Sequence, residues 1–191
     1  MNNRYFLLRH GQNVWQVQKK AFIYPAKTNF SIRLTLKGKK QVKKSIKRIK
    51  KEKIDLIYSS DFKRTKETSA IAAKEFGIKK INFDKRLRDI NMGIFHGRMK
   101  EDYYRFFNYD KKKFSQKPLK GESWTELKKR TMSFLKDLEK KYKNKKILIV
   151  GHGDPLWILE GLIKKMSDKK LLKELFVKKN YIQVGELRKA N

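Results

Sequence analysis

The sequence predicts an α/β fold, a three-layer α/β/α sandwich around a mostly parallel central sheet. Short apolar runs alternate along the chain with longer amphipathic segments, as strands and covering helices do in such sheets. Only three prolines and ten glycines punctuate the 191 residues, which favours long helices and few breaks. We therefore expect a single domain over residues 1–191.

Five short runs are expected to be strands because they are apolar and end in polar or turn-forming residues. They cover residues 5–8, 54–58, 80–83, 146–150 and 181–184. Right-handed crossovers between parallel strands place the carboxyl ends of the runs at 5–8, 54–58 and 146–150 at one common edge. Ligands bind at this edge of open α/β sheets.

The helices are predicted from apolar spacing and capping residues. Thr35 is a typical N-cap, and Val42, Ile46 and Ile49 behind it recur at intervals of four and three, through about residue 51. A second helix is expected over about 62–76, capped by the residues at 59–61, with Gly77 as its stop. Further helices are expected over 100–109, 122–142, 155–166 and 168–176, with irregular segments at 13–30, 84–97 and 110–120.

The composition indicates the cellular location to be expected. No apolar run approaches the roughly 20 residues that span a membrane, so no membrane partner is expected. The chain contains no cysteine, which fits a reducing compartment. Met1 is followed almost at once by the first expected strand, so no signal peptide is expected. These features together predict a cytoplasmic protein.

The charge is unusual, with 51 lysines and arginines against 19 aspartates and glutamates, a formal net charge of +32. Such a surface attracts polyanions non-specifically through its long-range potential. The lysines are spread through nearly every expected helix, which favours ordinary solvated faces over a dedicated nucleic-acid surface. The oligomeric state cannot be inferred from these patterns.

Two histidines follow strands in matching contexts. His10 lies between Arg9 and Gly11, and His152 lies between two glycines. A guanidinium beside the first histidine indicates an anionic partner, most naturally a phosphate, which it can bind through two hydrogen bonds. Either histidine alone would more simply be a structural residue at a strand end, but the pair at one edge predicts a phosphate site.

Six motifs in register resemble those of the histidine phosphatase superfamily, which includes phosphoglycerate mutases and related phosphatases. They are LRHGQ at 8–12, LTLKGKKQ at 34–41, YSSDFKRTKET at 58–68, LRD at 87–89 with Gly93 and Gly97, GES at 121–123 and VGHG at 150–153. The resemblance implies a phosphoglycerate mutase-like fold and phosphoryl transfer without a metal or other cofactor. At 191 residues the chain is most similar to the compact phosphatase branch.

The resemblance also implies roles for individual residues. His10 would attack phosphorus and form a phosphohistidine, which divides one difficult step into two. Asp89 would protonate the leaving oxygen and then activate water. The residues that would bind and neutralise the phosphate are Arg9, Arg64, His152, Gln16 and Gly153.

Some positions depart from the family pattern. Asp89 stands where glutamate is usual, and Asp154 is a second candidate for the proton donor. Asn13 and Gln16 replace a usual Thr or Ser and a usual Asn. His96 occupies a position that is commonly Glu or Gln, and a metal site formed by His10, His96 and His152 fits poorly beside Arg9. Arg64 and Asp89 could also be simple helix and turn residues.

Three functions remain open at this point. The first is a metal-independent phosphomonoesterase acting on a small phosphorylated metabolite. The second is a phosphoglycerate mutase, which also uses a phosphohistidine. The third is a catalytically degenerate basic module that binds polyanions or nucleic acid. For the first, Lys19, Lys20, Lys112 and Lys117 could favour multiply charged substrates.

Overall fold

The computed structural model describes residues 1–109 and 112–191, and it confirms the predicted three-layer α/β/α architecture. In these described residues, five strands form one sheet in the order β3-β2-β4-β1-β5. Their bounds are β1 Arg4–Arg9, β2 Leu56–Ser59, β3 Ile81–Phe83, β4 Lys146–Gly151 and β5 Leu187–Lys189. The pairs β1·β4, β4·β2 and β2·β3 are parallel, and β5 is antiparallel to β1.

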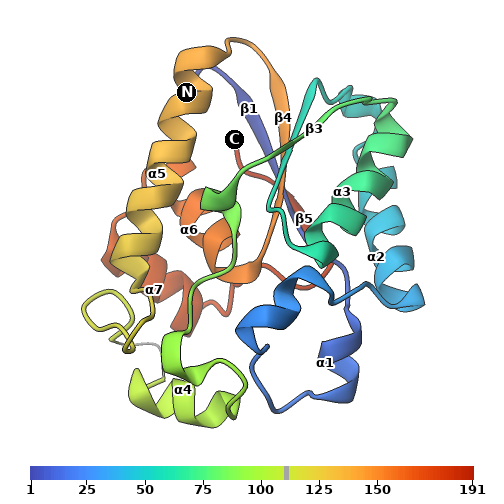
Figure 1. Cartoon of the computed structure of the whole chain (residues 1–191). Coiled ribbons are helices and arrows are strands. Elements are labelled where there is room, and N and C mark those ends of the chain that lie inside the picture. The colour runs from blue at the N-terminus through green and yellow to red at the C-terminus, as the bar shows by residue number, and fades with distance from the viewer. Residues whose placement is uncertain (110–111) are drawn as a thin grey trace.

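The described part of the chain contains seven α-helices beside the sheet, and two pairs of them cover its faces (Figure 1). Helices α2 and α3 lie on one face, whereas α5 and α6 lie on the other. Helices α1 and α4 lie beyond the end of the sheet that carries the carboxyl ends of β1 and β4. The bounds are α1 Val14–Gln18, α2 Leu36–Lys47, α3 Lys63–Phe76, α4 Lys100–Phe106, α5 Trp124–Lys141, α6 Gly153–Ile163 and α7 Asp168–Phe176.

The strand pleat divides the interior into two cores. On β1, Tyr5 and Leu7 pack with α5 and α6, while Phe6 and Leu8 pack with α2 and α3. All four side chains are fully buried. Because both faces of β1 are covered, its residues read as a continuous apolar run rather than an alternating one.

Most expected helix ends are confirmed. The Thr35 hydroxyl accepts a hydrogen bond from the Gly38 amide at 2.9 Å, and Gly77 ends α3 with φ +66°. The expected cap of α3 was wrong. Phe62 occupies the N-cap, and its apolar side chain has no acceptor for a capping hydrogen bond. The Asp61 carboxylate pairs with Arg88 at 2.7 and 2.5 Å.

The predicted last strand was also wrong. Residues 181–184 are not a strand. The Tyr181 hydroxyl donates to the Asp154 carboxylate, and Ile182 is fully buried in the core. The chain then turns at Gly185, with φ +73°, and only β5 runs back beside β1. The segment at 13–30, expected to be irregular, contains α1 and the 3₁₀ helix Ala26–Phe30. Part of the loop expected at 110–120, residues 110–111, lies outside the described residues.

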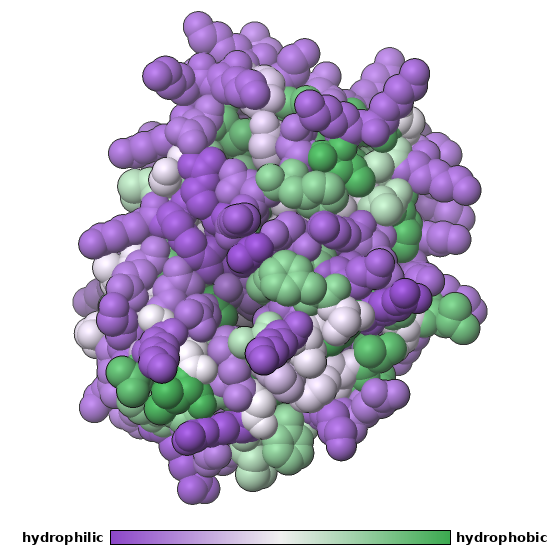
Figure 2. Space-filling view, in the orientation of Figure 1, coloured by the Kyte–Doolittle hydropathy of each residue, from purple (hydrophilic) through white to green (hydrophobic). Residues whose placement is uncertain are grey.

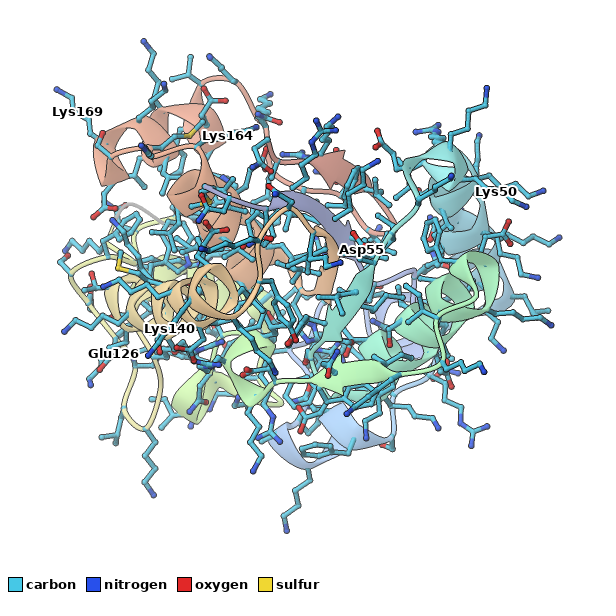
Figure 3. All side chains as sticks on the ribbon, turned by 90° about the horizontal axis from the view of Figure 1, so that it is seen from above. Lys50, Asp55, Glu126, Lys140, Lys164 and Lys169 are labelled. Carbon is cyan, nitrogen blue, oxygen red and sulfur yellow. The ribbon has the colours of Figure 1, made fainter. Side chains whose placement is uncertain are left out.

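Polar side chains dominate the visible surface (Figure 2). Hydrophilic residues cover most of the visible face, with isolated apolar groups between them (Figure 2). Lys50, Lys140, Lys164 and Lys169 project from separate elements around the molecule (Figure 3). Within the described residues, no helix has both the length and the apolar character needed to cross a membrane.

Candidate active site

The ends of three parallel strands bring the motifs together. Arg9 at the end of β1 pairs with Gly151 at the end of β4, and Ser59 at the end of β2 pairs with Val150. The next residue on each strand therefore enters the same space, and these residues are His10, Ser60 and His152. The common edge expected from the sequence is confirmed.

The His10 imidazole is buried and its hydrogen bond defines its tautomer. Nδ1 lies 2.9 Å from the Gly11 carbonyl oxygen, which can only accept, so Nδ1 carries the hydrogen. Burial, together with the positive charges of Arg64 and Arg9, holds the pKa of His10 well below its usual value. The ring is therefore neutral, and the lone pair is on Nε2.

The turn after His10 is fixed by close backbone packing against α2. A Cβ on Gly11 would collide with the Gly38 carbonyl, and one on Gly38 would collide with the Gln12 carbonyl. The Gln41 side chain accepts a hydrogen bond from the Gln12 amide at 3.0 Å. The glycine and glutamine of the LTLKGKKQ motif thus hold the strand end that carries the histidine.

His152 lies against His10, with 5.3 Å between the ring centroids. Its Nε2 is 3.0 Å from the Ser60 hydroxyl, and the side chain is fully buried. Burial and the neighbouring positive charges lower the pKa of His152 well below its usual value, so this ring is also neutral. Its Nδ1 lies 3.7 Å from the Asp89 carboxylate, a contact that is therefore not an ion pair.

Arg64 is fully buried at the first turn of α3. Its Nη1 donates to Asn29 Oδ1 at 2.9 Å, and its Nη2 lies 3.3 Å from Asp89 Oδ2. The guanidinium carbon also lies 4.6 Å from the centre of the Tyr24 ring and 5.1 Å from that of Phe62. Four side chains thus fix the plane of the guanidinium.

Arg9 is held by the C-terminal segment. Its Nη1 donates to the Ile182 carbonyl at 2.8 Å, and its guanidinium carbon is 5.5 Å from the centre of the Tyr181 ring. Within the described residues, Nε of Arg9, Nε of Arg64 and Nδ1 of His152 are buried without a hydrogen-bond partner. The two unpartnered guanidinium N–H groups are donors of the kind that bind an oxyanion.

Asp89 is held in place through its backbone. Arg130 of α5 donates to the carbonyl oxygens of Asp89, at 3.2 Å, and of Arg86. Arg130 is itself held by Glu122, with contacts of 2.6 and 2.9 Å. The glutamate of the GES motif thereby positions the segment that carries Asp89. Burial raises the pKa of Asp89, partly offset by the nearby Arg64 charge.

A cavity of about 330 Å³ opens above this cluster. Of the predicted site residues, Arg9, His10, Gln16, Asp89 and Gly153 line it. Arg64 and His152 are fully buried and reach the cluster through their contacts with Asp89 and His10. The structure therefore brings all seven predicted site residues to one place.

Asn13 and Gln16, the two residues at the start of α1 that depart from the family pattern, are hydrogen-bonded to each other. Asn13 caps α1 by accepting from the Gln16 amide nitrogen, and the Gln16 side-chain oxygen accepts from the Asn13 amide nitrogen, both at 3.1 Å. With its oxygen held in this capping box, Gln16 can present only its NH₂ group to the cavity.

Asp154 and Tyr181 both line the cavity, and sequence reasoning identified only Asp154. The Tyr181 hydroxyl donates to Asp154 Oδ1 at 2.6 Å, and a Cβ on Gly153 would collide with that hydroxyl. Tyr181 was missed because it comes from the C-terminal segment that was expected to be a strand. Its packing under Arg9 is a tertiary contact with no local sequence signal.

His96 does not join His10 and His152. Its Nδ1 lies 2.8 Å from the Tyr24 carbonyl oxygen and its Nε2 lies 3.2 Å from the Asn91 side chain. In the described part of the chain, no group of three or more histidine, aspartate or glutamate side chains is arranged to hold a metal ion.

The chain is similar to several known proteins. It is 29% identical over 154 residues to phosphoglycerate mutase-like protein 4 of Arabidopsis thaliana, covering 77% of this chain and 65% of that protein. It is 30% identical over 128 residues to phosphoserine phosphatase 1 of Hydrogenobacter thermophilus, covering 64% and 60%. The chain thus spans less than two thirds of either relative.

The chain also resembles a solved structure and matches a family model. Mycobacterial glucosyl-3-phosphoglycerate phosphatase superposes with a TM-score of 0.78 at 18% identity, over 96% of this chain and 88% of that one. The model of the histidine phosphatase superfamily (branch 1) matches residues 5–178. Because this match covers nearly the whole chain, the protein belongs to the histidine phosphatase superfamily, as its six motifs suggested.

Proposed function

We propose that this protein is a metal-independent phosphomonoesterase that hydrolyses a small phosphorylated metabolite through a phosphohistidine on His10. The observation that carries the proposal is the tautomer of His10. Its Nδ1 hydrogen is bound by the Gly11 carbonyl, so the Nε2 lone pair is available beside the guanidinium groups of Arg9 and Arg64. The phosphoserine phosphatase named above supports hydrolysis as the reaction type.

In the first step, His10 Nε2 attacks phosphorus in line with the ester oxygen. The N–P bond forms as the P–O bond breaks, and the leaving oxygen takes the proton from Asp89. A raised pKa favours the protonated form of Asp89 that this step needs. Arg9, Arg64 and His152 stabilise the charge on the three equatorial oxygens, and Gln16 and Gly153 add contacts to the phosphate.

In the second step, water attacks phosphorus on the side that the alcohol has left. Asp89, now a carboxylate, accepts a proton from this water as the O–P bond forms and the N–P bond breaks. His10 returns to its neutral form, and Asp89 is again protonated. Inorganic phosphate then leaves, and both groups are in the state in which they began.

A mutase is the second candidate, because one relative is a phosphoglycerate mutase-like protein. A mutase would also form the phosphohistidine but would return the phosphoryl group to the bound substrate rather than to water. The two functions differ in their products. A hydrolase releases one inorganic phosphate per ester consumed, whereas a mutase releases an isomeric ester and almost no phosphate.

The proposal is tested by phosphate release from p-nitrophenyl phosphate and a panel of sugar and glycerate phosphates, with EDTA present. We expect turnover that survives EDTA and is lost in His10→Asn. Turnover that disappears with EDTA would contradict the metal-independent route. Conversion of phosphoglycerate to an isomer without phosphate release would favour the mutase, and inactivity on every ester would favour the polyanion-binding module.

We infer that residues 1–191 form one domain, since β1 pairs with β5 and both cores pack on one sheet. We also propose a cytoplasmic location, a small phosphorylated substrate as partner, and non-specific polyanion binding driven by the +32 charge.

A further inference from the structure

The cavity wall contains polar residues that the proposed chemistry does not use. The lysines considered for multiply charged substrates are exposed and do not line it; they are Lys19, Lys20, Lys112 and Lys117. Lys100, Lys113 and Tyr24 line it instead. Tyr24 also contacts an arginine of the phosphate site, because the Arg64 guanidinium carbon lies 4.6 Å from the centre of its ring. Tyr24 therefore forms the part of the wall beside the phosphate site.

Tyr24 is held at its backbone, its ring and its hydroxyl. His96 Nδ1 donates to the Tyr24 carbonyl oxygen at 2.8 Å, and the Asn13 side chain reaches the hydroxyl at 3.0 Å. Between these two contacts, the ring lies against the Arg64 guanidinium. A hydroxyl held in this way is already in position before a ligand binds, so binding costs little further ordering.

The direction of the Asn13 hydrogen bond leaves the tyrosine hydrogen available. Asn13 Oδ1 accepts the hydrogen bond from the Gln16 amide, so the group that faces Tyr24 is the Asn13 NH₂. The amide donates, and the tyrosine oxygen accepts. Within residues 1–109 and 112–191, the Tyr24 hydroxyl makes no second hydrogen bond. Burial raises the pKa of Tyr24, so the hydroxyl keeps its hydrogen at neutral pH.

We propose that Tyr24 is a further catalytic residue, which donates a hydrogen bond from its hydroxyl to a non-bridging oxygen of the transferred phosphoryl group. This inference rests on the proposed phosphatase function. A phosphoryl group offers three strongly accepting oxygens, and a neutral donor adds to the binding by Arg9 and Arg64 without adding charge. A donor already in place stabilises the charge of the transition state at no cost of rearrangement.

The proposal also gives a common role to three residues that depart from the family pattern. Asn13 donates to the Tyr24 hydroxyl, and Gln16 fixes which end of the Asn13 amide faces it. His96 holds the Tyr24 backbone. These three are positioning residues, since each acts on the phosphoryl group through Tyr24, although Gln16 also lines the cavity itself.

Tyr24→Phe tests the proposal because it keeps the ring against Arg64 and removes only the hydroxyl. We expect kcat/KM on p-nitrophenyl phosphate to fall about 10–10²-fold and the inhibition constant of inorganic phosphate to rise about 10-fold. The phosphoryl group is common to every ester, so kcat/KM on an alkyl phosphate should fall by the same factor. A hydroxyl that acted on the leaving alcohol would instead change the two esters unequally.

Tyr142→Phe is the matched control. It also removes one hydrogen-bonded hydroxyl, which lies 3.0 Å from the Tyr58 hydroxyl, and Tyr142 does not line the cavity. This variant should leave kcat/KM and the inhibition by phosphate unchanged. Thermal unfolding of both variants shows whether a loss of activity reflects a loss of folded protein.

Asn13→Thr tests the role of Asn13 and provides a second variant if Tyr24→Phe folds poorly. Threonine can still cap α1, but it has no NH₂ group to orient the Tyr24 hydroxyl. We expect a loss of about 3–10-fold in kcat/KM, smaller than that in Tyr24→Phe. The double variant should lose no more than Tyr24→Phe alone, because Asn13 acts through the hydroxyl. Losses that multiply would overturn this role of Asn13.

The inference is overturned if Tyr24→Phe retains wild-type kcat/KM and phosphate inhibition, or if its losses differ between the two esters. If the wild-type protein hydrolyses no ester, the proposed function fails. Calorimetric titration with inorganic phosphate then still tests Tyr24, since weaker binding in Tyr24→Phe than in Tyr142→Phe would support the hydrogen bond without any turnover. Equal binding in the two variants, or no binding by the wild-type protein, would overturn it.

Discussion

Arg64 and Asp89 meet at the floor of the cavity, with 3.3 Å between Nη2 and Oδ2, although 25 positions separate them in the sequence. Burial raises the pKa of Asp89, and the Arg64 charge opposes this rise. A phosphate that binds Arg64 would compete for that charge and add negative charge of its own. Substrate binding therefore favours protonation of Asp89, which is the form that the first step needs.

The acid role of Asp89 predicts that its removal slows hydrolysis most for esters with poor leaving groups. Asp89→Asn should lower kcat/KM on an alkyl phosphate by about 10²–10⁴-fold. The loss on p-nitrophenyl phosphate should be far smaller, because nitrophenolate leaves without a proton. Hydrolysis of the phosphoenzyme is common to both esters and does not enter kcat/KM. The loss of kcat/KM on the alkyl ester relative to the loss on p-nitrophenyl phosphate therefore measures the acid role of Asp89 alone.

Two further variants make this comparison specific. Asp89→Glu keeps a titratable carboxyl one methylene longer and should retain much of the activity on the alkyl ester. Asp61→Asn removes a neighbouring carboxylate that pairs with Arg88, and it should affect both esters equally. An equal loss on the two esters in Asp89→Asn would exclude Asp89 as the acid.

Activity and phosphate binding are predicted to depend on the planar guanidinium of Arg64. Arg64→Lys keeps the charge but cannot donate to Asn29 and to a phosphate in one fixed plane. We expect kcat/KM to fall about 10²–10³-fold and inhibition by inorganic phosphate to weaken. The control is Arg33→Lys at an exposed position, which should change neither quantity. Wild-type phosphate affinity in Arg64→Lys would show that Arg64 is structural.

The buried histidines predict loss of stability in mild acid. In the unfolded chain, His10 and His152 take up protons below pH of about 6.5, whereas in the fold their lowered pKa values keep them neutral. The unfolded state then binds more protons, so the free energy of unfolding falls as the pH drops below about 6.5.

Each histidine contributes a slope of up to about 1.4 kcal/mol per pH unit in this window. Denaturant unfolding between pH 7 and pH 5 measures the slope, and His10→Asn and His152→Asn should each reduce it. Asp89 has a raised pKa, so its protonation in the folded state increases the free energy of unfolding as the pH falls. The effect of each histidine is therefore obtained by comparing wild type and variant at the same pH. A variant slope equal to that of wild type would contradict the neutral, buried state.

The close packing of Gly38 predicts that a single methyl group disturbs the active site from outside it. In Gly38→Ala, Cβ would collide with the Gln12 carbonyl, two positions after His10. We expect a loss of about 1–3 kcal/mol in the free energy of unfolding, with reduced activity in the protein that remains folded. Lys39→Ala, at the exposed neighbouring position, should be nearly neutral. Full stability in Gly38→Ala would mean that the turn relaxes easily.

The residues at strand ends could be predicted because their signals are local. His10 and His152 each follow an apolar run and adjoin glycine, and parallel pairing alone brings such ends to one edge. Thr35 and Gly77 were likewise found from helix capping rules. For these positions, neighbours in the sequence determine the geometry.

The walls of the site could not be predicted, because they depend on contacts between distant segments. Asn29 reaches Arg64 across 35 positions, and Tyr181 reaches Asp154 across 27. Lys113 lies in a basic segment where its exposed neighbour Lys112 has the same residue type. Nothing in the local pattern distinguishes the buried lysine from the exposed one, and the last strand was misplaced for the same reason.

The central claim is that His10 carries the phosphoryl group, and trapping the intermediate tests it most directly. The protein is mixed with a phosphate ester, quenched in base within the first turnovers, and its mass and the modified residue are determined. The account predicts one phosphoryl group on His10 that is stable in base and lost in acid, and that is absent in His10→Asn. Turnover with no adduct in the wild-type protein, or an unchanged adduct in His10→Asn, would contradict it.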